Sequence, residues 1–278
     1  MTRLAVLGSP IAHSLSPTIH LAAYRKLGLE WSYEAIEVQE VKLREFLRTC
    51  DSTWRGLSLT MPLKSEAITI CDEVDPLALQ VGGANTITWR GSKTHAHNTD
   101  VLGFFNALKL HDATRIDSVA ILGGGATARA AVAAVSKFAE RITVYIRDPM
   151  REESLIAAKG VGIATLRIAP WEQASEGLNE PLVISTTPRG INDIFADIDL
   201  NEPGVLFEVL YSPWPTAIVS QWVREGGRVI EGLELLVEQA IEQVRLFAPE
   251  IDLSDGSALR EVMLNAGRAE LIRRNSSD

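Results

Sequence analysis

The segment that decides the fold reads Val119-Ala120-Ile121-Leu122-Gly123-Gly124-Gly125-Ala126-Thr127-Ala128-Arg129-Ala130. An apolar run, three glycines and an alanine-rich stretch in this order predict a buried strand, a tight turn and a helix. Glycines allow a ligand to approach the backbone closely, and the helix N-terminus offers N–H groups to a pyrophosphate. Ala128 stands where the usual G-x-G-x-x-G spacing has its last glycine, so an ordinary strand-to-helix turn is the alternative. We predict a nucleotide-binding turn.

The segment about 20 residues further on discriminates between dinucleotides in such folds. Here it contains Arg147, Asp148 and Arg151. The two arginines can clamp a 2′-phosphate, which favours NADP, whereas Asp148 can accept from a ribose diol, which favours NAD. The arginines outnumber the single acid, so we predict NADP, with a solvated charged loop as the alternative that involves no ligand.

Strands alternate with helices along the chain, which implies parallel βαβ units and an α/β fold. We expect Ser16 to be the N-cap of the first helix, with Pro17 at its first position. A second α/β unit begins near Asp100, and we expect a sheet of six strands there. The expected strands are 4–7, 31–38, 56–60, 85–89, 118–122, 141–146, 182–185, 205–207 and 228–230, and the expected helices are 16–27, 41–47, 67–71, 76–81, 101–110, 126–138 and one from 235 onward.

Composition narrows the class of protein. The 278 residues are 46% apolar and 23% charged, which suits one large or two modest globular domains. A net charge of −9 argues against non-specific binding to nucleic acid or anionic membranes. No apolar run approaches the ~18 residues of a membrane span, and residues 1–8 lack the apolar region of a signal peptide. Cys50 and Cys71 match no zinc or disulfide pattern. We expect a reduced, cytoplasmic protein, either monomer or homodimer.

Three short motifs precede the glycine turn, and they carry Lys64, Asn85 and Asp100. A lysine and a carboxylate beside a bound redox cofactor can move a proton while the cofactor moves a hydride. The pattern therefore predicts an alcohol–ketone dehydrogenase. Taken singly, Lys64 reads as a surface lysine and Asn85 as a turn residue. His95 and His97 alternate on an expected strand without further ligands, so we predict no metal site.

Several motifs occur together in the order found in one known family. These segments are Gly8-Ser9-Pro10-Ile11-Ala12-His13-Ser14-Leu15-Ser16-Pro17, Leu57-Ser58-Leu59-Thr60-Met61-Pro62-Leu63-Lys64, Gly83-Ala84-Asn85-Thr86, Asn98-Thr99-Asp100, Thr187-Pro188, Tyr211-Ser212-Pro213 with Thr216, and Gly232-Leu233 through Gln239-Ala240. Over nearly its whole length the chain resembles the shikimate dehydrogenases.

The resemblance implies a reversible, NADPH-dependent reduction of 3-dehydroshikimate to shikimate, a step of aromatic amino-acid biosynthesis. It implies that Lys64 and Asp100 are the catalytic pair. The substrate-binding residues that it implies are Ser14, Ser16, Thr60, Asn85, Gln239 and Tyr211. The cofactor-binding residues that it implies are Gly123, Gly124, Gly125, Ala126, Arg147, Arg151, Thr187, Gly232 and Leu235.

Two domains with a cleft between them follow from the same resemblance. Residues 1–100, completed by C-terminal helices at 236–278, would bind the substrate, and residues 101–235 would form a Rossmann-like NADP-binding domain. Gln239 has to return to the substrate side after the Rossmann-like segment ends.

The chain departs from the family pattern at several positions. Ser58 replaces a common asparagine, Ile146 replaces the asparagine that often precedes the first clamp arginine, and Leu235 stands where a methionine often packs on nicotinamide. An NAD-preferring quinate/shikimate dehydrogenase is one alternative, although Ser16 fits the shikimate type. A non-catalytic metabolite sensor is the other, and the presence of both Lys64 and Asp100 argues against it.

Overall fold

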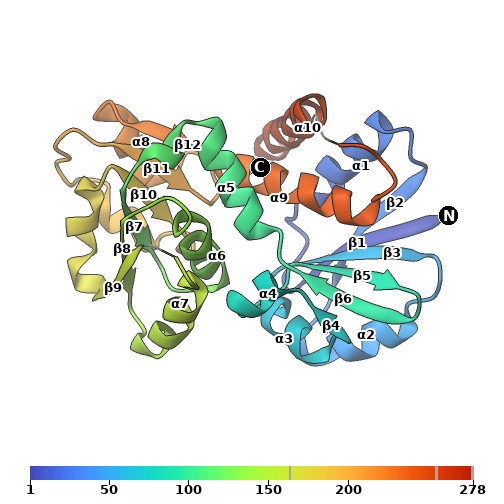
Figure 1. Cartoon of the computed structure of the whole chain (residues 1–278). Helices are drawn as coiled ribbons and strands as arrows, with labels where there is room; N and C mark the ends of the chain where they lie inside the picture. The colour runs from blue at the N-terminus through green and yellow to red at the C-terminus, as the bar shows by residue number, and fades with distance from the viewer. Residues whose placement is uncertain (163, 254–255, 277–278) are drawn as a thin grey trace. The chain divides into compact units, whose positions relative to one another are not determined.

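The computed structural model describes residues 1–162, 164–253 and 256–276. The chain forms two compact units, one from Met1–Thr99 with Leu236–Asp278 and one from Asp100–Leu235. Within the described ranges each unit is built on a six-stranded sheet (Figure 1). The predicted α/β class with two α/β units is confirmed, while the cleft between them stays a prediction.

The first unit contains a mixed sheet with strand order β2-β1-β3-β5-β6-β4. Its strands are β1 (Thr2–Gly8), β2 (Trp31–Glu37), β3 (Trp54–Leu59), β4 (Glu73–Val74), β5 (Thr86–Arg90) and β6 (Lys93–His97). β1 runs parallel to β2 and β3, but β5 runs antiparallel to both β3 and β6. The expectation of purely parallel units is therefore wrong here, because Gly91, at φ +63°, allows a tight turn that joins β5 directly to β6.

Helices cover both faces of this sheet, with α1, α9 and α10 on one face and α2, α3 and α4 on the other (Figure 1). Their bounds are α1 (Ser16–Lys26), α2 (Leu43–Thr49) after the short turn η1 (Glu40–Lys42), α3 (Leu63–Ile70), α4 (Pro76–Gln80), α9 (Gly232–Phe247) and α10 (Ser257–Asn275). A Cβ at Gly56 would clash with the ring of Phe247, so α9 packs directly on the backbone of β3. The last part of the chain therefore completes the core of the first unit.

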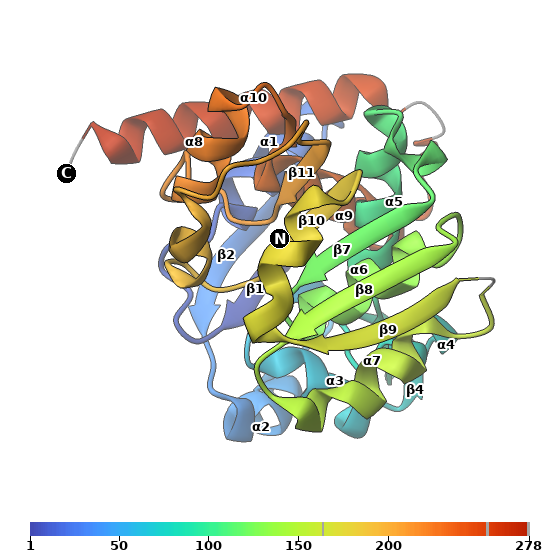
Figure 2. The same ribbon diagram turned by 90° about the vertical axis from the view of Figure 1, so that its left-hand side faces the viewer.

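The second unit contains a fully parallel sheet with strand order β12-β11-β10-β7-β8-β9 (Figure 2). Its strands are β7 (Ser118–Leu122), β8 (Arg141–Ile146), β9 (Thr165–Pro170), β10 (Leu182–Ser185), β11 (Val205–Glu208) and β12 (Arg228–Ile230). β7 and β10 are buried along their whole length, as expected for central parallel strands covered on both faces. The sixth strand, β9, is the one that the sequence did not locate.

Helices also lie on both faces of the second sheet. The bounds are α5 (Asp100–Leu110), η2 (Ala113–Arg115), α6 (Ala126–Val135), η3 (Pro149–Arg151), α7 (Glu152–Lys159), η4 (Trp171–Asn179), η5 (Ile191–Phe195) and α8 (Ala217–Arg224). α5, α6 and α7 cover one face, and α8 with η4 and η5 covers the other (Figures 1 and 2). α6 ends at Val135, three residues before the predicted end at Phe138.

One helix start differs from the prediction. Ser16 is the first residue of α1, not its N-cap; Leu15 occupies the N-cap position, and no side chain caps the helix there. The backbone N–H of Ser16 instead donates to the hydroxyl of Ser14, 3.2 Å away. The Ser16 hydroxyl is therefore not used as a cap.

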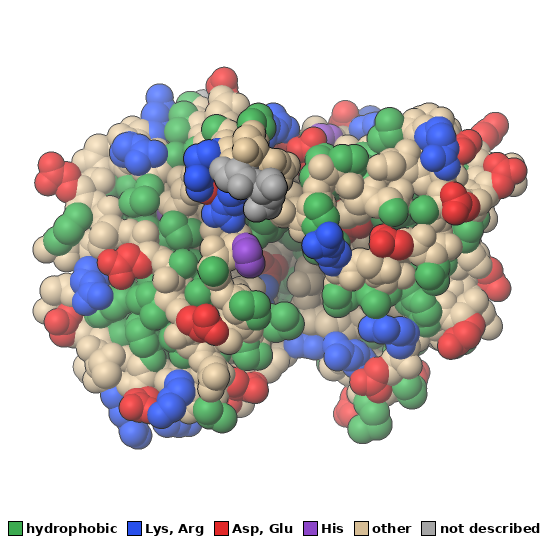
Figure 3. All heavy atoms as spheres, turned by 180° about the vertical axis from the view of Figure 1, so that it is seen from behind, with side chains coloured by type: hydrophobic (Ala, Val, Ile, Leu, Met, Phe, Trp, Pro, Cys, Tyr) green, Lys and Arg blue, Asp and Glu red, His purple; other side chains and the backbone are tan. Residues whose placement is uncertain are grey.

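Acidic and basic side chains are interspersed over the face that Figure 3 shows. Among the described residues, no helix is long and apolar enough to cross a membrane.

Candidate active site

The loop before α1 places Ser14 and Ser16 in the first unit. Ser16 is buried, and Ser14 is half-buried. Arg274, near the end of α10, donates to the backbone oxygens of His13 at 2.8 Å and Ser14 at 3.3 Å. The C-terminal helix thus fixes the loop that carries both predicted substrate-binding serines. Sequence reasoning missed Arg274, because its partners lie about 260 positions away.

Thr60 and Lys64 follow the carboxyl end of β3. The backbone N–H of Thr60 donates to Leu7 O at 2.9 Å, and a Cβ on Gly8 would clash with the Thr60 side chain. Lys64 lies in the first turn of α3 and is half-buried. Its backbone oxygen accepts from Ala84 N at 2.8 Å. The structure therefore brings Lys64 against the segment that ends in Asn85.

Asn85 is buried and joins two other parts of the first unit. Its Oδ1 accepts from the backbone N–H of Thr99 at 2.8 Å, and its Nδ2 donates to Thr99 Oγ1 at 2.9 Å and to Gln239 Oε1 at 3.3 Å. Gln239, on α9, also donates to Leu236 O at 2.6 Å. Asn85 and Gln239 therefore meet, and they hold the residue immediately before Asp100.

A second contact fixes the approach to Asp100. Asp75 caps α4 by accepting from Ala78 N at 2.8 Å, and its other oxygen accepts from Asn98 N at 3.1 Å. His97 pairs with the same carboxylate at 3.4 Å. Asp100 itself is buried and is the first residue of α5.

Two buried hydroxyls near Ser16 were not among the predicted site residues. Tyr33 Oη donates to Ser58 Oγ at 2.6 Å, and the side chain of Ser16 is near enough to Tyr33 to influence its pKa. Burial raises the pKa of Tyr33 above its usual value, so this phenol stays protonated. In the sequence, Ser58 stands out only as a departure from the family pattern. The signal available in the sequence was a polar residue in each of two expected strands, Tyr33 in 31–38 and Ser58 in 56–60.

The glycine turn of the second unit has the predicted strand–turn–helix form. Gly123 adopts φ +112°, and a Cβ there would lie 2.7 Å from Thr186 Oγ1. A Cβ on Gly124 would meet Ile146 Cγ2 at 2.9 Å. Gly125 is the N-cap of α6, and Ala126 is its first helical residue. Only glycine fits the first of these positions without strain, which is the requirement of a turn that brings a ligand close to the backbone.

Arginines gather beside this turn. Arg151 Nη1 donates to Gly124 O at 3.3 Å, and Arg151 Nε pairs with Asp148 at 3.5 Å. Arg129, on α6, is a residue that sequence reasoning missed: burial, and then the nearby charge of Arg151, lower the pKa of its guanidinium. Arg147 is exposed. Two neighbouring cations at a helix N-terminus suit a phosphate group.

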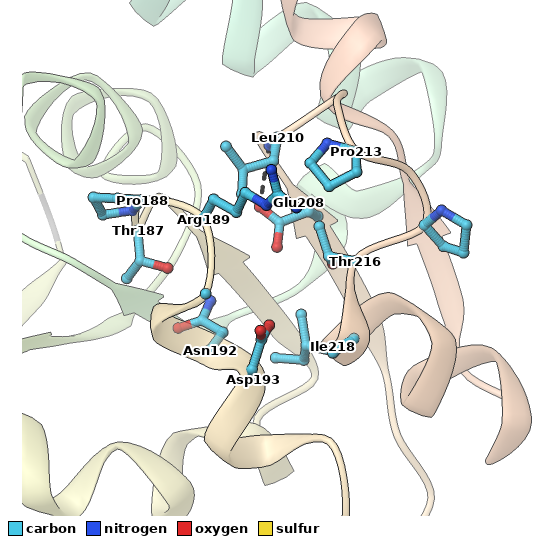
Figure 4. A pocket seen from close by; sticks show the side chains of 13 residues that line it. Thr187, Pro188, Arg189, Asn192, Asp193, Glu208, Leu210, Pro213, Thr216 and Ile218 are labelled. Atoms are coloured by element: carbon cyan, nitrogen blue, oxygen red, sulfur yellow. Dashed lines mark hydrogen bonds between the residues drawn. The ribbon is translucent and has the colours of Figure 1, made fainter. Parts of the chain in front are cut away.

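A pocket of about 140 Å³ lies past the carboxyl ends of β10 and β11 (Figure 4). Thr187, which is buried, and Thr216, the N-cap of α8, line it from two different loops. Its volume suits a small polar group rather than a whole dinucleotide. Ligands of parallel α/β sheets bind at this edge of the sheet.

Glu208 lies at the centre of this pocket in Figure 4. It accepts from Ser185 Oγ at 2.9 Å and from Leu210 N at 3.1 Å, and Asn192 Nδ2 donates to Ser185 Oγ at 2.7 Å. Burial raises the pKa of Glu208 to about 7. The carboxyl group thus links the two loops that follow β10 and β11.

Three further predicted residues lie in the second unit. Tyr211 is half-buried in the loop after β11, and Leu235 is buried on α9. Gly232 begins α9, where a Cβ would clash with the backbone of Val209. Close packing of two backbones requires glycine at this position. Among the residues described, no group of three histidine, cysteine or acidic side chains is placed to bind a metal ion.

Comparison with protein families matches residues 6–87 to the substrate-binding domain of shikimate dehydrogenase. Among curated proteins, a shikimate dehydrogenase (NADP(+)) of Thermus thermophilus is 33% identical over 271 residues, which cover 96% of this chain and 99% of that protein. The shikimate dehydrogenase (NADP(+)) of Ignicoccus hospitalis is 30% identical over 246 residues, 87% of this chain and 92% of that protein.

Solved structures show the same likeness. Mycobacterium tuberculosis shikimate dehydrogenase superposes with a TM-score of 0.87 at 34% identity, covering 97% of this chain and 100% of that one. A shikimate 5-dehydrogenase from Thermus thermophilus, solved in complex with NADP(H) and shikimate, gives a TM-score of 0.81 at 32% identity, covering 96% of this chain and 100% of that one.

Proposed function

The chain belongs to the shikimate dehydrogenase family, and on this premise we propose that it reduces 3-dehydroshikimate reversibly to shikimate with NADPH. The observation that carries the proposal is the tie between two motifs. Lys64 lies against the Ala84–Asn85 segment, and Asn85 bonds to Thr99, the residue before Asp100. One hydrogen-bonded framework thus holds the backbone that carries the Lys64 ammonium and the residue before the Asp100 carboxylate, and these two groups suit proton exchange at a carbonyl oxygen.

Lys64 is the proposed proton donor to the developing alkoxide of 3-dehydroshikimate. In the reverse direction it accepts the proton of the shikimate hydroxyl. Asp100 orients the ammonium and accepts a hydrogen bond from the same hydroxyl. Burial lowers the pKa of His20 to about 3, so this histidine of the first unit stays neutral and does not compete as an acid.

The residues of the glycine turn fit NADP. Gly123, Gly124 and the N-terminus of α6 would hold the pyrophosphate, and Arg151 with Arg147 and Arg129 would face the 2′-phosphate. Asp148 accepts from Met150 N at 3.0 Å and pairs with Arg151, so its carboxylate already serves its own loop. This arrangement favours NADP over NAD. When bound, the nicotinamide supplies or accepts the hydride.

The substrate and cofactor are assigned to different units. We place the substrate on Ser14, Ser16, Thr60, Asn85 and Gln239 of the first unit, with Tyr211 from the second. Thr187, Gly232 and Leu235 are placed on the nicotinamide side. A cytoplasmic location and a monomeric or homodimeric state remain predictions of the sequence.

A steady-state assay of the purified protein tests the function. Shikimate and quinate are each oxidised with NADP or NAD, and reduced cofactor is followed by its absorbance. We expect the highest kcat/KM for shikimate with NADP. A higher kcat/KM for quinate or for NAD would support the quinate/shikimate alternative. Absence of turnover in all four combinations, with shikimate still bound in a calorimetric titration, would support the sensor alternative and overturn the proposal.

A further inference from the structure

Gln243 is a buried side chain on α9 that none of the site predictions include. Its carboxamide has four polar partners from three other segments of the first unit. Oε1 accepts from Ser58 Oγ at 2.8 Å and meets His20 Nε2 at 3.1 Å. Nε2 donates to Asn85 O at 3.2 Å and to Thr86 Oγ1 at 3.1 Å. Both edges of the amide are therefore used.

The orientation of this amide is fixed by the chemistry of one partner. The backbone oxygen of Asn85 can only accept, so the NH₂ group of Gln243 must face it. Oε1 then faces Ser58 and His20, so both of these groups must donate. His20 carries its proton on Nε2, and its Nδ1 is left to accept from Tyr24 Oη, 3.3 Å away.

The same reasoning extends to Tyr33. Ser58 gives its single proton to Gln243, so it can only accept from Tyr33. The ring of Tyr33 stacks on His20, with centroids 4.2 Å apart and planes 7° from parallel. Ser58 thus holds the hydroxyl of Tyr33, and His20 packs against its ring. Both Ser58 and His20 are in turn hydrogen-bonded to Gln243 Oε1.

We propose that Gln243 is a positioning residue for substrate binding: its amide fixes the Ser58 and Tyr33 hydroxyls with one edge and the backbone of Asn85 with the other. The inference rests on the proposed function, because it names what aligns the substrate side of that site. It requires a neutral group with an acceptor edge and a donor edge. No hydrocarbon side chain and no carboxylate meets both requirements.

Replacement by glutamic acid tests this requirement. In Gln243→Glu the protonated acid keeps a carbonyl oxygen for Ser58 and His20 and an O–H for Asn85 O. The ionised acid has no donor, and it places a negative oxygen against the carbonyl oxygen of Asn85. Burial raises the pKa of such a carboxyl above its usual value of about 4.3, which brings ionisation toward the working range. The titratable side chains of the network are His20, Tyr24 and Tyr33. Burial lowers the pKa of the first to about 3 and raises the pKa of both tyrosines, so all three stay neutral there.

The experiment measures KM for shikimate, KM for NADP and kcat from about pH 5 to about pH 9 in wild type, Gln243→Glu and Gln243→Leu. We expect the shikimate KM of Gln243→Glu, relative to wild type, to rise by about tenfold or more from the acidic to the alkaline end, a loss equivalent to one or two hydrogen bonds. Gln243→Leu should show the raised KM at every pH. The NADP KM should stay within about twofold, and kcat should change less than the shikimate KM.

Gln221→Glu is the matched control, because Gln221 is also buried but lies in the second unit, where its Nε2 donates to Ile198 O. Its shikimate KM should follow wild type with pH. The inference would be overturned if the ratio of the shikimate KM of Gln243→Glu to that of wild type did not change with pH, or if the KM values for shikimate and NADP changed equally. The proposed function would still stand in either case, provided that the wild type turns over shikimate. A wild type without shikimate turnover would overturn both. If Gln243→Leu fails to fold, the inference is still tested by the shikimate KM of Gln243→Glu, which should be near that of wild type at low pH and rise with pH.

Discussion

Arg274 donates from its guanidinium to the backbone oxygen of Ser14, 3.3 Å away and 260 positions earlier in the chain. The same group donates to His13 O at 2.8 Å and pairs with Glu270 at 2.8 Å. The carboxylate of Glu270 thus orients the guanidinium toward the loop. A residue near the end of the last described helix therefore shapes the loop on which the substrate is proposed to bind.

Arg274→Ala should raise the shikimate KM by about tenfold, because two hydrogen bonds, each contributing about 0.5–1.5 kcal/mol, no longer hold the loop. The NADP KM should not change. Arg273→Ala is the control, because it removes the same charge and a pairing with the same Glu270 while Arg274 keeps its bonds to the loop. Steady-state kinetics of both variants check the prediction, and equal effects would contradict it.

Lys64→Ala should lower kcat by roughly 10²–10⁴-fold, the usual contribution of a positioned acid–base group. Shikimate affinity should fall less, because the hydroxyl contacts proposed for Ser14, Ser16 and Thr60 remain. Asp100→Asn should lower both kcat and affinity, since the lysine loses its partner and the substrate an acceptor. Near wild-type turnover in Lys64→Ala, with none in Asp100→Asn, would reverse the assigned roles.

The arginines beside the glycine turn should decide cofactor preference. Replacing Arg147 and Arg151 by alanine should raise the KM for NADP by about tenfold or more and leave the KM for NAD within about threefold, because charge-assisted bonds to a 2′-phosphate are lost. Arg129→Ala tests whether the third cation belongs to the same cluster. Parallel increases for both cofactors would assign the cluster to the shared pyrophosphate instead.

Glu208 should make stability depend on pH. Its pKa is raised to about 7 in the folded protein from an ordinary value of 4.5, so the folded state holds this proton more tightly. The contribution is therefore fully present below about pH 4.5 and is lost as pH rises through about 7, by at most about 3 kcal/mol. Urea unfolding of wild type and Glu208→Gln from about pH 4.5 to about pH 8 measures it as the difference between the two proteins. His20, whose pKa in the folded protein is lowered to about 3, makes stability change with pH in the opposite direction. Because both proteins contain His20, its contribution cancels in the difference between them. A constant difference across this range would contradict the prediction.

The central strands were the most predictable part of the fold. β7, β8 and β10 have the bounds expected from the sequence, because short apolar runs between turn residues are typical of buried parallel strands, and the edge strand β12 also has its expected bounds. β9 was missed: Thr165–Pro170 is an edge strand, mostly open to solvent, and it ends in proline. The direction of β5 was missed as well, since a strand pattern does not tell which neighbour it pairs with.

Some features of the candidate site could likewise be predicted from the sequence, and others could not. Motif order predicts Lys64, Asn85 and Gln239 as site residues, and the structure adds that Asn85 and Gln239 form a hydrogen bond. The partnership of Ser58 with Gln243 spans 185 positions and depends on how α9 packs on β3, so no local pattern indicates it. Ser16 was wrongly predicted as an N-cap because a serine before proline fits that role equally well in sequence.

The first unit is assembled from two separated parts of the chain, and this has a consequence for synthesis on the ribosome. Residues 1–99 are made first, but Gln243 and Phe247, which fill polar and apolar positions against β3, are added only after all of residues 100–235. The second unit is continuous and can complete its sheet in the meantime. A nascent chain whose first 235 residues have left the ribosome can therefore have one finished core, while the other still has an open apolar face that is prone to aggregation.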